Sequence, residues 1–284
     1  MTKTSFFFIT LFLTIQTFAQ ETFSVDAIMK NQKLKIKTQF ECDQKGKNCK
    51  IIFQDHFDNK GRLTKHIEFS SGKPFMTSLY HYNKFNKADI FYIQFSGQKS
   101  YVSQVNKFDN NGNITESQSC FENSGCSTSE KYFYNRNNKL IKKIEFIDGK
   151  PDTIYEYFYD KKGNNIKETT QYPANHDELK ELNYFDKNNR MIKSISYQNG
   201  KPFDSTIYSY DTNGNLTLLN WKAGYKSFYS YDRDGNEVKY LSFSQNNQKI
   251  DHRVMTYKNK LEQTRIHYIG KSIERFFKFN YQFY

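Results

Sequence analysis

The chain has little of the material from which a deep globular core is built. Only 37% of its 284 residues are hydrophobic, and it contains one Trp and four Pro. After the N-terminal segment, no apolar run approaches the ~20 residues that span a bilayer as a helix. The sequence also has no HExxH, Gly-x-Ser-x-Gly, P-loop or dinucleotide motif. These absences argue against a helical membrane protein and against an enzyme of the common classes.

Aromatic residues are abundant by contrast. They make up 18% of the chain, with 22 Tyr and 27 Phe. Disordered segments are poor in aromatics, so this composition argues against disorder despite the polar character of the chain. Large flat side chains suit cross-strand pairing on a pleated surface. The composition therefore indicates a β protein without one deep core.

The chain is basic, with a formal net charge of +12. The Lys and Arg residues are spread along the sequence rather than gathered into one block. Such a charge favours polyanionic partners, so an anionic polymer is one candidate ligand. A solvated, solubilising surface is the simpler interpretation, and both remain open.

The first 19 residues have the pattern of a signal peptide. Lys3 gives a short positive region, an apolar stretch runs from Phe6 to Phe18, and Ala19 precedes the expected cleavage before Gln20. No Cys follows the site, so no lipid anchor is predicted. We expect an exported protein, periplasmic or extracellular.

Four cysteines fall into two close pairs, and each pair brackets a polar, Gly-containing turn. In an oxidising compartment each pair is expected to close as a structural disulfide across a hairpin. A zinc site is the competing interpretation, although the spacing is not Cys-x2-Cys. The pairs are Cys42 with Cys49 and Cys120 with Cys126.

An internal repeat of about 25 residues dominates the sequence. Each unit contains an aromatic residue followed by Asp or Asn and a polar turn, most clearly Asp-x-x-Gly-Asn. Aromatic residues alternate before the turn, and aliphatic residues alternate with Lys after it. Period-two alternation indicates strands with one packed face. The units begin at Phe57, Tyr82, Phe108, Tyr134, Tyr159, Phe185, Tyr210, Tyr231 and Tyr257.

The turn chemistry supports a chain of hairpins. Asp caps the turn through its side chain and Gly supplies the positive φ. A second reversal, written Gly-Lys-Pro in three units, returns the chain to the next repeat. The predicted fold is all-β: tandem antiparallel β-hairpins in an extended or coiled meander, a solenoid or partial shell. Only Asp177 to Leu182 suggests a helical turn, inside a longer loop.

The segment from Tyr210 to Val238 resembles a YD repeat of the RHS family, because Tyr-Asp-x-x-Gly-Asn occurs twice at close spacing. The longer units resemble MORN-like variant repeats of exported bacterial proteins. The resemblance implies a spiralling β scaffold that encloses cargo in the large members of the family and has no catalytic residues of its own. In this chain the scaffold would be too short to enclose anything. The predicted organisation is a signal peptide at 1–19, an N-terminal capping hairpin with a disulfide at 20–50, and a YD-like repeat array at 51–284.

Three features were weighed as sites. The Asp-x-Asn-Gly turns resemble calcium loops, but their Gly and Glu positions do not fit an EF-hand, so turn chemistry is preferred. His176 lies in the predicted long loop, where a general base could stand, yet no nucleophile accompanies it. The third feature is the turn that contains the only indole. Its side chains could stack on a sugar if they are exposed, but packing between repeats is the simpler interpretation. The residues concerned are Trp221, Lys222 and Tyr225.

The sequence therefore predicts an exported, non-enzymatic scaffold without a cofactor that binds a glycan or protein partner. The alternatives are a small hydrolase or carbohydrate-active enzyme using the His176 loop, and a purely structural or immunity-type repeat protein. An outer-membrane barrel is disfavoured because Lys interrupts the apolar stripes, where lipid would make it costly. The alternating C-terminal segment from Phe277 is expected to be a capping strand.

Overall fold

The computed structural model describes residues 33–122, 124–269 and 271–283, and these residues form strands and turns. The predicted signal peptide at 1–19 lies outside the described residues. The strands are β1 (Leu34–Cys42), β2 (Lys50–Phe57), β3 (Leu63–Ser70), β4 (Lys73–Tyr82), β5 (Ala88–Phe95), β6 (Tyr101–Phe108), β7 (Ile114–Phe121), β8 (Gly125–Tyr134), β9 (Leu140–Ile147), β10 (Lys150–Tyr159), β11 (Asn165–Tyr172), β12 (Asp177–Phe185), β13 (Met191–Gln198), β14 (Lys201–Tyr210), β15 (Leu216–Trp221), β16 (Lys226–Tyr231), β17 (Glu237–Phe243), β18 (Lys249–Lys258), β19 (Leu261–Ile269) and β20 (Ser272–Phe283). The predicted all-β hairpin array is confirmed.

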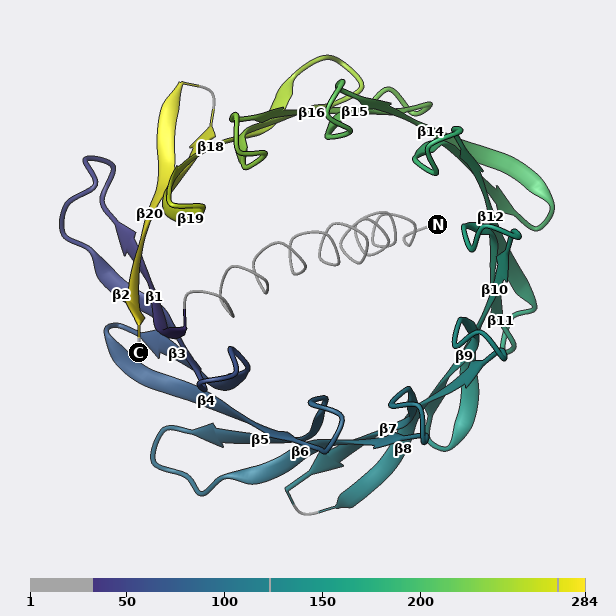
Figure 1. Ribbon diagram of the computed structural model, residues 1–284, viewed down its shortest axis with the longest axis horizontal. Helices are drawn as coiled ribbons and strands as arrows, with labels where there is room; N and C mark the ends of the chain where they lie inside the picture. The colour runs from purple at the N-terminus through teal and green to yellow at the C-terminus, as the bar shows by residue number, and fades with distance from the viewer. Residues whose placement is uncertain (1–32, 123, 270, 284) are drawn as a thin grey trace, which may run out of the picture.

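The array closes on itself, which corrects the expectation of an open solenoid or partial shell. Each strand pairs antiparallel with the next, and β1 also pairs with β20 from Leu34 opposite Phe283 to Cys42 opposite Phe276. The result is a closed 20-stranded antiparallel barrel (Figure 1). The N-terminal hairpin and the C-terminal strand are therefore neighbouring wall elements and cap no open end. The physical reason is that the right-handed twist of successive hairpins accumulates until the two edges meet.

The repeat turns are built as the sequence predicts. In the Asp109 turn, one carboxylate oxygen accepts the N–H groups of Asn111 and Asn113 at 2.9 and 2.8 Å. Gly112 takes a φ of 78° at the fourth position. Units that lack this Gly place Asn there, and Asn tolerates the left-handed region. The Asn residues concerned are Asn86, Asn138 and Asn189, with φ of 58°, 56° and 60°.

Several turns also contact the next turn around the ring. The side-chain amides of Asn111 and Asn113 donate to Asn138 Oδ1 at 3.2 and 3.1 Å. Arg62 likewise donates to Asn86 Oδ1 at 3.0 Å. These bonds join successive repeats at one rim of the barrel, so the turn sequence serves lateral assembly as well as chain reversal.

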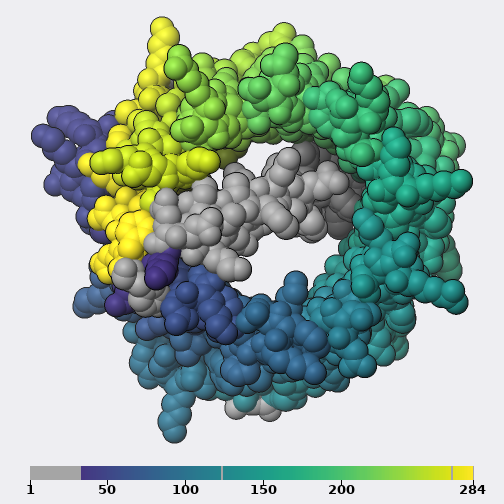
Figure 2. All heavy atoms as spheres, in the orientation of Figure 1, coloured from purple at the N-terminus to yellow at the C-terminus, as the bar shows by residue number. Residues whose placement is uncertain are grey.

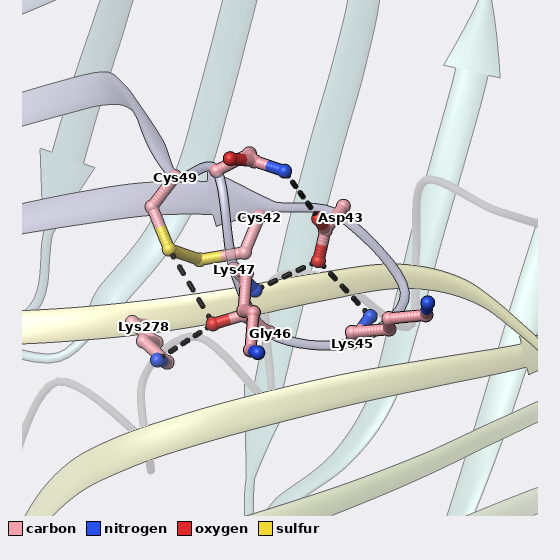
Figure 3. Close-up of a disulfide and its surroundings, with 8 residues drawn as sticks. Cys42, Asp43, Lys45, Gly46, Lys47, Cys49 and Lys278 are labelled. Atoms are coloured by element: carbon pink, nitrogen blue, oxygen red, sulfur yellow. Dashed lines mark hydrogen bonds between the residues drawn. A yellow bond between two sulfur atoms is a disulfide. The ribbon is translucent and has the colours of Figure 1, made fainter.

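One side of every strand faces the interior. The tip between β1 and β2 lies outside the ring, and there Lys278 Nζ donates to the Gly46 carbonyl at 2.8 Å (Figures 1 and 3). Lys278 therefore points outward. Its neighbours Phe277 and Phe279, 4% and 5% exposed, point inward. Because residues opposite each other on neighbouring strands share a face, the pairing register carries this assignment around the sheet.

The barrel wall is a single layer with little hydrophobic core. Figure 2 shows that it surrounds a central opening. Among the described residues, few hydrophobic side chains are buried, and several of these lie near the pairing of β1 with β20. The buried hydrophobic side chains are Leu34, Cys42, Ile67, Cys120, Leu219, Met255, Phe277 and Phe279. The composition predicted a β protein without one deep core, and this wall agrees with that prediction.

The segment from Asp177 to Leu182 is not helical. It belongs to β12, which pairs with β11 and β13. His176 ends the short turn before it, with a φ of 58° and an exposed side chain. The predicted long loop is wrong because Asp177 to Leu182 continues the two-residue alternation of the sheet.

Candidate functional site

From β8 to β12 most carboxylates lie on the inner face of the wall and most ammonium groups on its outer face. Alternating residues on these strands place carboxylates inside and ammonium groups outside. Glu130 and Lys131 are such neighbours on β8, and Lys180 and Glu181 are such neighbours on β12. The interior carboxylates are Glu130, Glu145, Glu168 and Glu181, and the exterior cations are Lys131, Lys142, Lys167 and Lys180. We call these interior residues the acidic wall.

One cation balances part of the acidic wall. Lys143 Nζ lies 3.1 Å from Glu130 Oε1 and 2.6 Å from Glu145 Oε1. Burial opposes its charge, but the bonds to these carboxylates raise the pKa of Lys143 above its ordinary value. Tyr155 donates to Glu145 Oε2 at 3.2 Å, and Tyr132 donates to Glu130. Burial, followed by the contact with Glu130, raises the pKa of Tyr132. This network fixes both carboxylates on the interior face.

A cleft of about 340 Å³ opens beside the network; we call it the wall cleft. Its polar groups include the Gln104 amide, the Ser119 hydroxyl and the Glu130 and Glu145 carboxylates. Ile147 adds an aliphatic side chain. The cleft thus offers hydrogen-bond acceptors and donors next to apolar surface, as a small-molecule site requires. The remaining lining residues are Ser129, Phe146 and Asp152.

Two carboxylates of the acidic wall make no hydrogen bond or ion pair with Lys143. Glu168 on β11 stands directly opposite Glu181 on β12. Neither has an ion-pair partner among the described side chains. Burial first, and then the charge of Glu181, raises the pKa of Glu168 to about 7. Burial also raises the pKa of Glu181. Near neutral pH Glu168 is therefore only partly ionised, and an approaching cation would favour its carboxylate form.

The residues predicted as a ligand surface form the tip of the short hairpin. Trp221 ends β15, is half-buried and pairs with Thr206. Lys222 is exposed, and Tyr225 is 36% exposed. The three side chains stay together at one rim, but the wall cleft lies between β6 and β10 and includes none of them. A second, smaller cleft at the β4–β5 hairpin does not include them either.

The histidine arrangement closest to a catalytic one lies elsewhere. His66 Nδ1 is 2.6 Å from Asp55 Oδ1, and Ser78 is paired with His66 on the next strand. The bond to Asp55, against the effect of burial, raises the pKa of His66. In the described part of the chain no hydrogen bond joins Ser78 to His66. The backbone N–H groups of these strands serve the ladder, so they form no oxyanion hole.

Both predicted disulfides are present. Cys42 bonds to Cys49, and Cys120 bonds to Cys126. The zinc interpretation is therefore wrong. Within residues 33–122, 124–269 and 271–283, no three His, Cys, Asp or Glu side chains are arranged to hold a metal ion. The turn aspartates that resembled calcium loops accept N–H groups of their own turns, as Asp211 does from Asn213 and Asn215.

Sequence reasoning missed the acidic wall and the wall cleft. The signal was present in the alternation of Lys with Glu at Glu130-Lys131, Lys167-Glu168 and Lys180-Glu181. In a strand this alternation separates the charges onto two faces. A net charge summed along the chain hides this separation, and so the basic residues seemed evenly spread.

Comparisons with known proteins do not identify a family. No protein-family model matches the chain, and no curated protein matches it. The chain is similar to the crystal structure of TcdB2-TccC3-Cdc42, with 9% identity and a TM-score of 0.34 over 81% of its length. It is similar to the Tc holotoxin pore of Photorhabdus luminescens, with 13% identity and a TM-score of 0.37 over 78%. It spans only 14% of either matched chain.

A third similar structure is a porin-like protein from Bacteroides uniformis. The identity is 12% and the TM-score is 0.33, over 88% of this chain and 98% of that chain. Likenesses of this strength do not carry a function over, so the functional argument depends on the chain's own residues.

Two further findings concern location. The disulfides indicate an exported or envelope protein, because such bonds persist in oxidising compartments. Among the described residues, none forms a helix that could span a membrane.

Proposed function

We propose that this protein is an exported, non-enzymatic barrel that binds a glycan in the wall cleft. The observation that supports the proposal is the lining of the cleft, where carboxylate, amide and hydroxyl groups meet. Sugar hydroxyls both donate and accept hydrogen bonds, and carboxylates and amides satisfy them from fixed positions. The Lys143 network holds two of these carboxylates in place before a ligand arrives, which lowers the ordering cost of binding.

The outer surface supports a wall in contact with water. Lys131 is exposed on β8, and Lys142, Lys167 and Lys180 face outward on the strands that follow. In the middle of a bilayer each such Lys would cost about 2–4 kcal/mol. We therefore place the protein in the periplasm or outside the cell, with its ligand reaching the interior face from solution.

A binding role fits better than hydrolysis. Neither of the two clefts described above includes His176, and Ser78 is not bonded to His66.

The relation of the repeats to the YD type stays a proposal as well. It is supported by turns in which Asp caps the backbone and Gly or Asn occupies the left-handed position.

The test is a glycan-array screen of the exported chain, repeated at low and high salt. Binding in the wall cleft should survive high salt and weaken about tenfold or more in Gln104→Ala and Ser119→Ala, since each removes one hydrogen-bonding group. Trp221→Ala is the matched comparison at the other predicted surface. If Trp221→Ala abolishes binding and the cleft variants retain it, the ligand lies at the hairpin tip and the cleft proposal is wrong.

The outer lysines favour a second candidate function, contact with an anionic polymer. Lys131, Lys167 and Lys180 present cationic groups beside aromatic rings on the convex face, including Lys167 Nζ 4.3 Å from the Phe158 ring. Binding of this kind should disappear at high salt because exposed charges are screened. It should weaken when these lysines are replaced with Gln and remain unchanged in Gln104→Ala.

A further inference from the structure

The interior face of β11 and β12 carries a set of oxygen atoms without cationic partners. Glu168 and Glu181 stand opposite each other across the two strands. Asn183 lies two residues further along β12, so its side chain projects from the same face. Neighbouring positions on one sheet face are within reach of a single small group.

Asn183 supplies the second, independent observation. Its side chain is only 7% exposed, and its Nδ2 donates to the Asn165 carbonyl at 3.1 Å. Its Oδ1 has no hydrogen-bond partner. A buried acceptor left unpaired costs about 1–3 kcal/mol, so a donor from outside the chain would be favoured there.

We propose that Glu168, Glu181 and the Asn183 amide oxygen form a site for a primary ammonium group of the bound ligand. This ammonium subsite deepens the glycan-binding proposal and rests on it: the glycan would be one that carries free amino groups. A primary ammonium has three N–H donors and no acceptor, and the subsite provides acceptors from three side chains.

Aromatic side chains flank the subsite. Tyr157 on β10 is near Glu168, and its pKa is raised by burial first and then by the charge of Glu168. Tyr208 on β14 is half-buried and experiences the charge of Glu181. Ring faces beside carboxylates favour an organic cation. A compact metal ion would need more oxygen ligands than these residues supply.

The neighbouring charges agree with an added cation. Lys143 is the basic group that acts on Glu168, and it is already held by Glu130 and Glu145. An ammonium placed between Glu168 and Glu181 would relieve the repulsion between them. The wall cleft lies on adjoining strands β6 to β10, so one extended ligand can contact both places.

The first experiment compares a β1→4 glucosamine hexamer with its fully N-acetylated counterpart by titration calorimetry at pH 7. The two oligomers differ only in whether each amino group is free or acetylated. The glucosamine hexamer should bind about tenfold or more tightly, and this preference should vanish in Glu168→Gln and Glu181→Gln. Glu156→Gln is the control, because Glu156 faces outward on β10 against Lys142. Equal affinities in the wild type, or a preference that survives both Gln variants, would overturn the subsite.

A second measurement does not depend on glycan binding. Carbon-13 NMR of the glutamate carboxyls should show the Glu168 titration midpoint moving to lower pH with methylammonium chloride, compared with sodium chloride at equal ionic strength. The movement should shrink in Asn183→Leu, which removes the amide oxygen. No difference between the two salts would mean that no ammonium group binds among these side chains, and the subsite would be refuted even if glycans bind the wall cleft. Binding of both hexamers with equal affinity, together with no methylammonium effect, would leave the cleft function standing alone.

Discussion

Replacing Glu168 with Gln should change how the stability of the barrel depends on pH. In the folded protein the pKa of Glu168 is about 7, against an ordinary value of 4.5, because burial and the charge of Glu181 disfavour the carboxylate. The folded state therefore binds a proton that the unfolded chain has already released between these two values. This difference corresponds to about 3 kcal/mol, an upper figure for a partly buried group.

The sign of the effect follows from the raised pKa. Below pH ~4.5 Glu168 is protonated in both states, and its contribution to stability is fully present. As the pH rises through 7, the folded state is forced to hold an ionised, buried carboxylate, and this contribution is lost. Gln cannot ionise. Glu168→Gln should thus match the wild type near pH 4 and exceed its unfolding free energy by up to about 3 kcal/mol at pH 8.

Urea unfolding at pH 4, 6 and 8, followed by circular dichroism, measures this difference directly. Titrating groups that do not interact with Glu168 contribute equally to the variant and the wild type, so their effects cancel at each pH. Glu156→Gln serves as the control, since Glu156 is solvent-accessible on the outer face and paired with Lys142 at 3.5 Å. The reasoning would be refuted if the wild type gained stability over Glu168→Gln between pH 5 and 8, or if Glu156→Gln showed the same gain.

Three further predictions concern the wall. Replacing Cys120 and Cys126 with Ser, which opens a link with a sequence separation of 6, should lower the unfolding free energy by about 2 kcal/mol in denaturant titrations; an unchanged midpoint would contradict this. Gly112→Val should lower the melting temperature more than Gly72→Val. Both glycines have a positive φ, but only at Gly112 would a Cβ meet a neighbouring ring, that of Phe85 at 3.2 Å. Equal losses of melting temperature would speak against packing between turns. Phe277→Asp, at a site only 4% exposed beside the seam, should expose β1 and β20 to amide hydrogen exchange before the other strands, whereas uniform exchange would show that the seam is not the weakest point.

The hairpins could be predicted because their signals are local. The Asp211 turn and the alternation before it specify chain reversal within a few residues, and Asn86 takes over the role of Gly by a known backbone preference. The cysteine pairs were predicted for the same reason, since each is close in sequence and brackets a turn. The segment before β13 was misread because Asp177 to Leu182 was taken as part of a loop, although the alternation of the sheet runs through these residues.

The candidate site could be predicted only in part. Glu130, Glu145 and Gln104 come from different repeats, and their meeting in the wall cleft depends on strand register. The alternation of Lys with Glu was readable, but its meaning depends on which face is inside. The curvature of the closed barrel decides which face is inside, and the sequence of one repeat does not determine that curvature.

The sequence by itself determined the strands, the turns, the disulfides and the two-faced pattern of each hairpin, because these depend on interactions between near neighbours. Only the tertiary structure decided that the array closes. The contact that completes the ring joins Glu41 to Phe277 and Arg275, residues from opposite ends of the chain. Closure depends on the twist and register of twenty strands added together. The twist between two neighbouring strands is small, and it brings the two edges of the sheet together only when it is summed around the whole barrel.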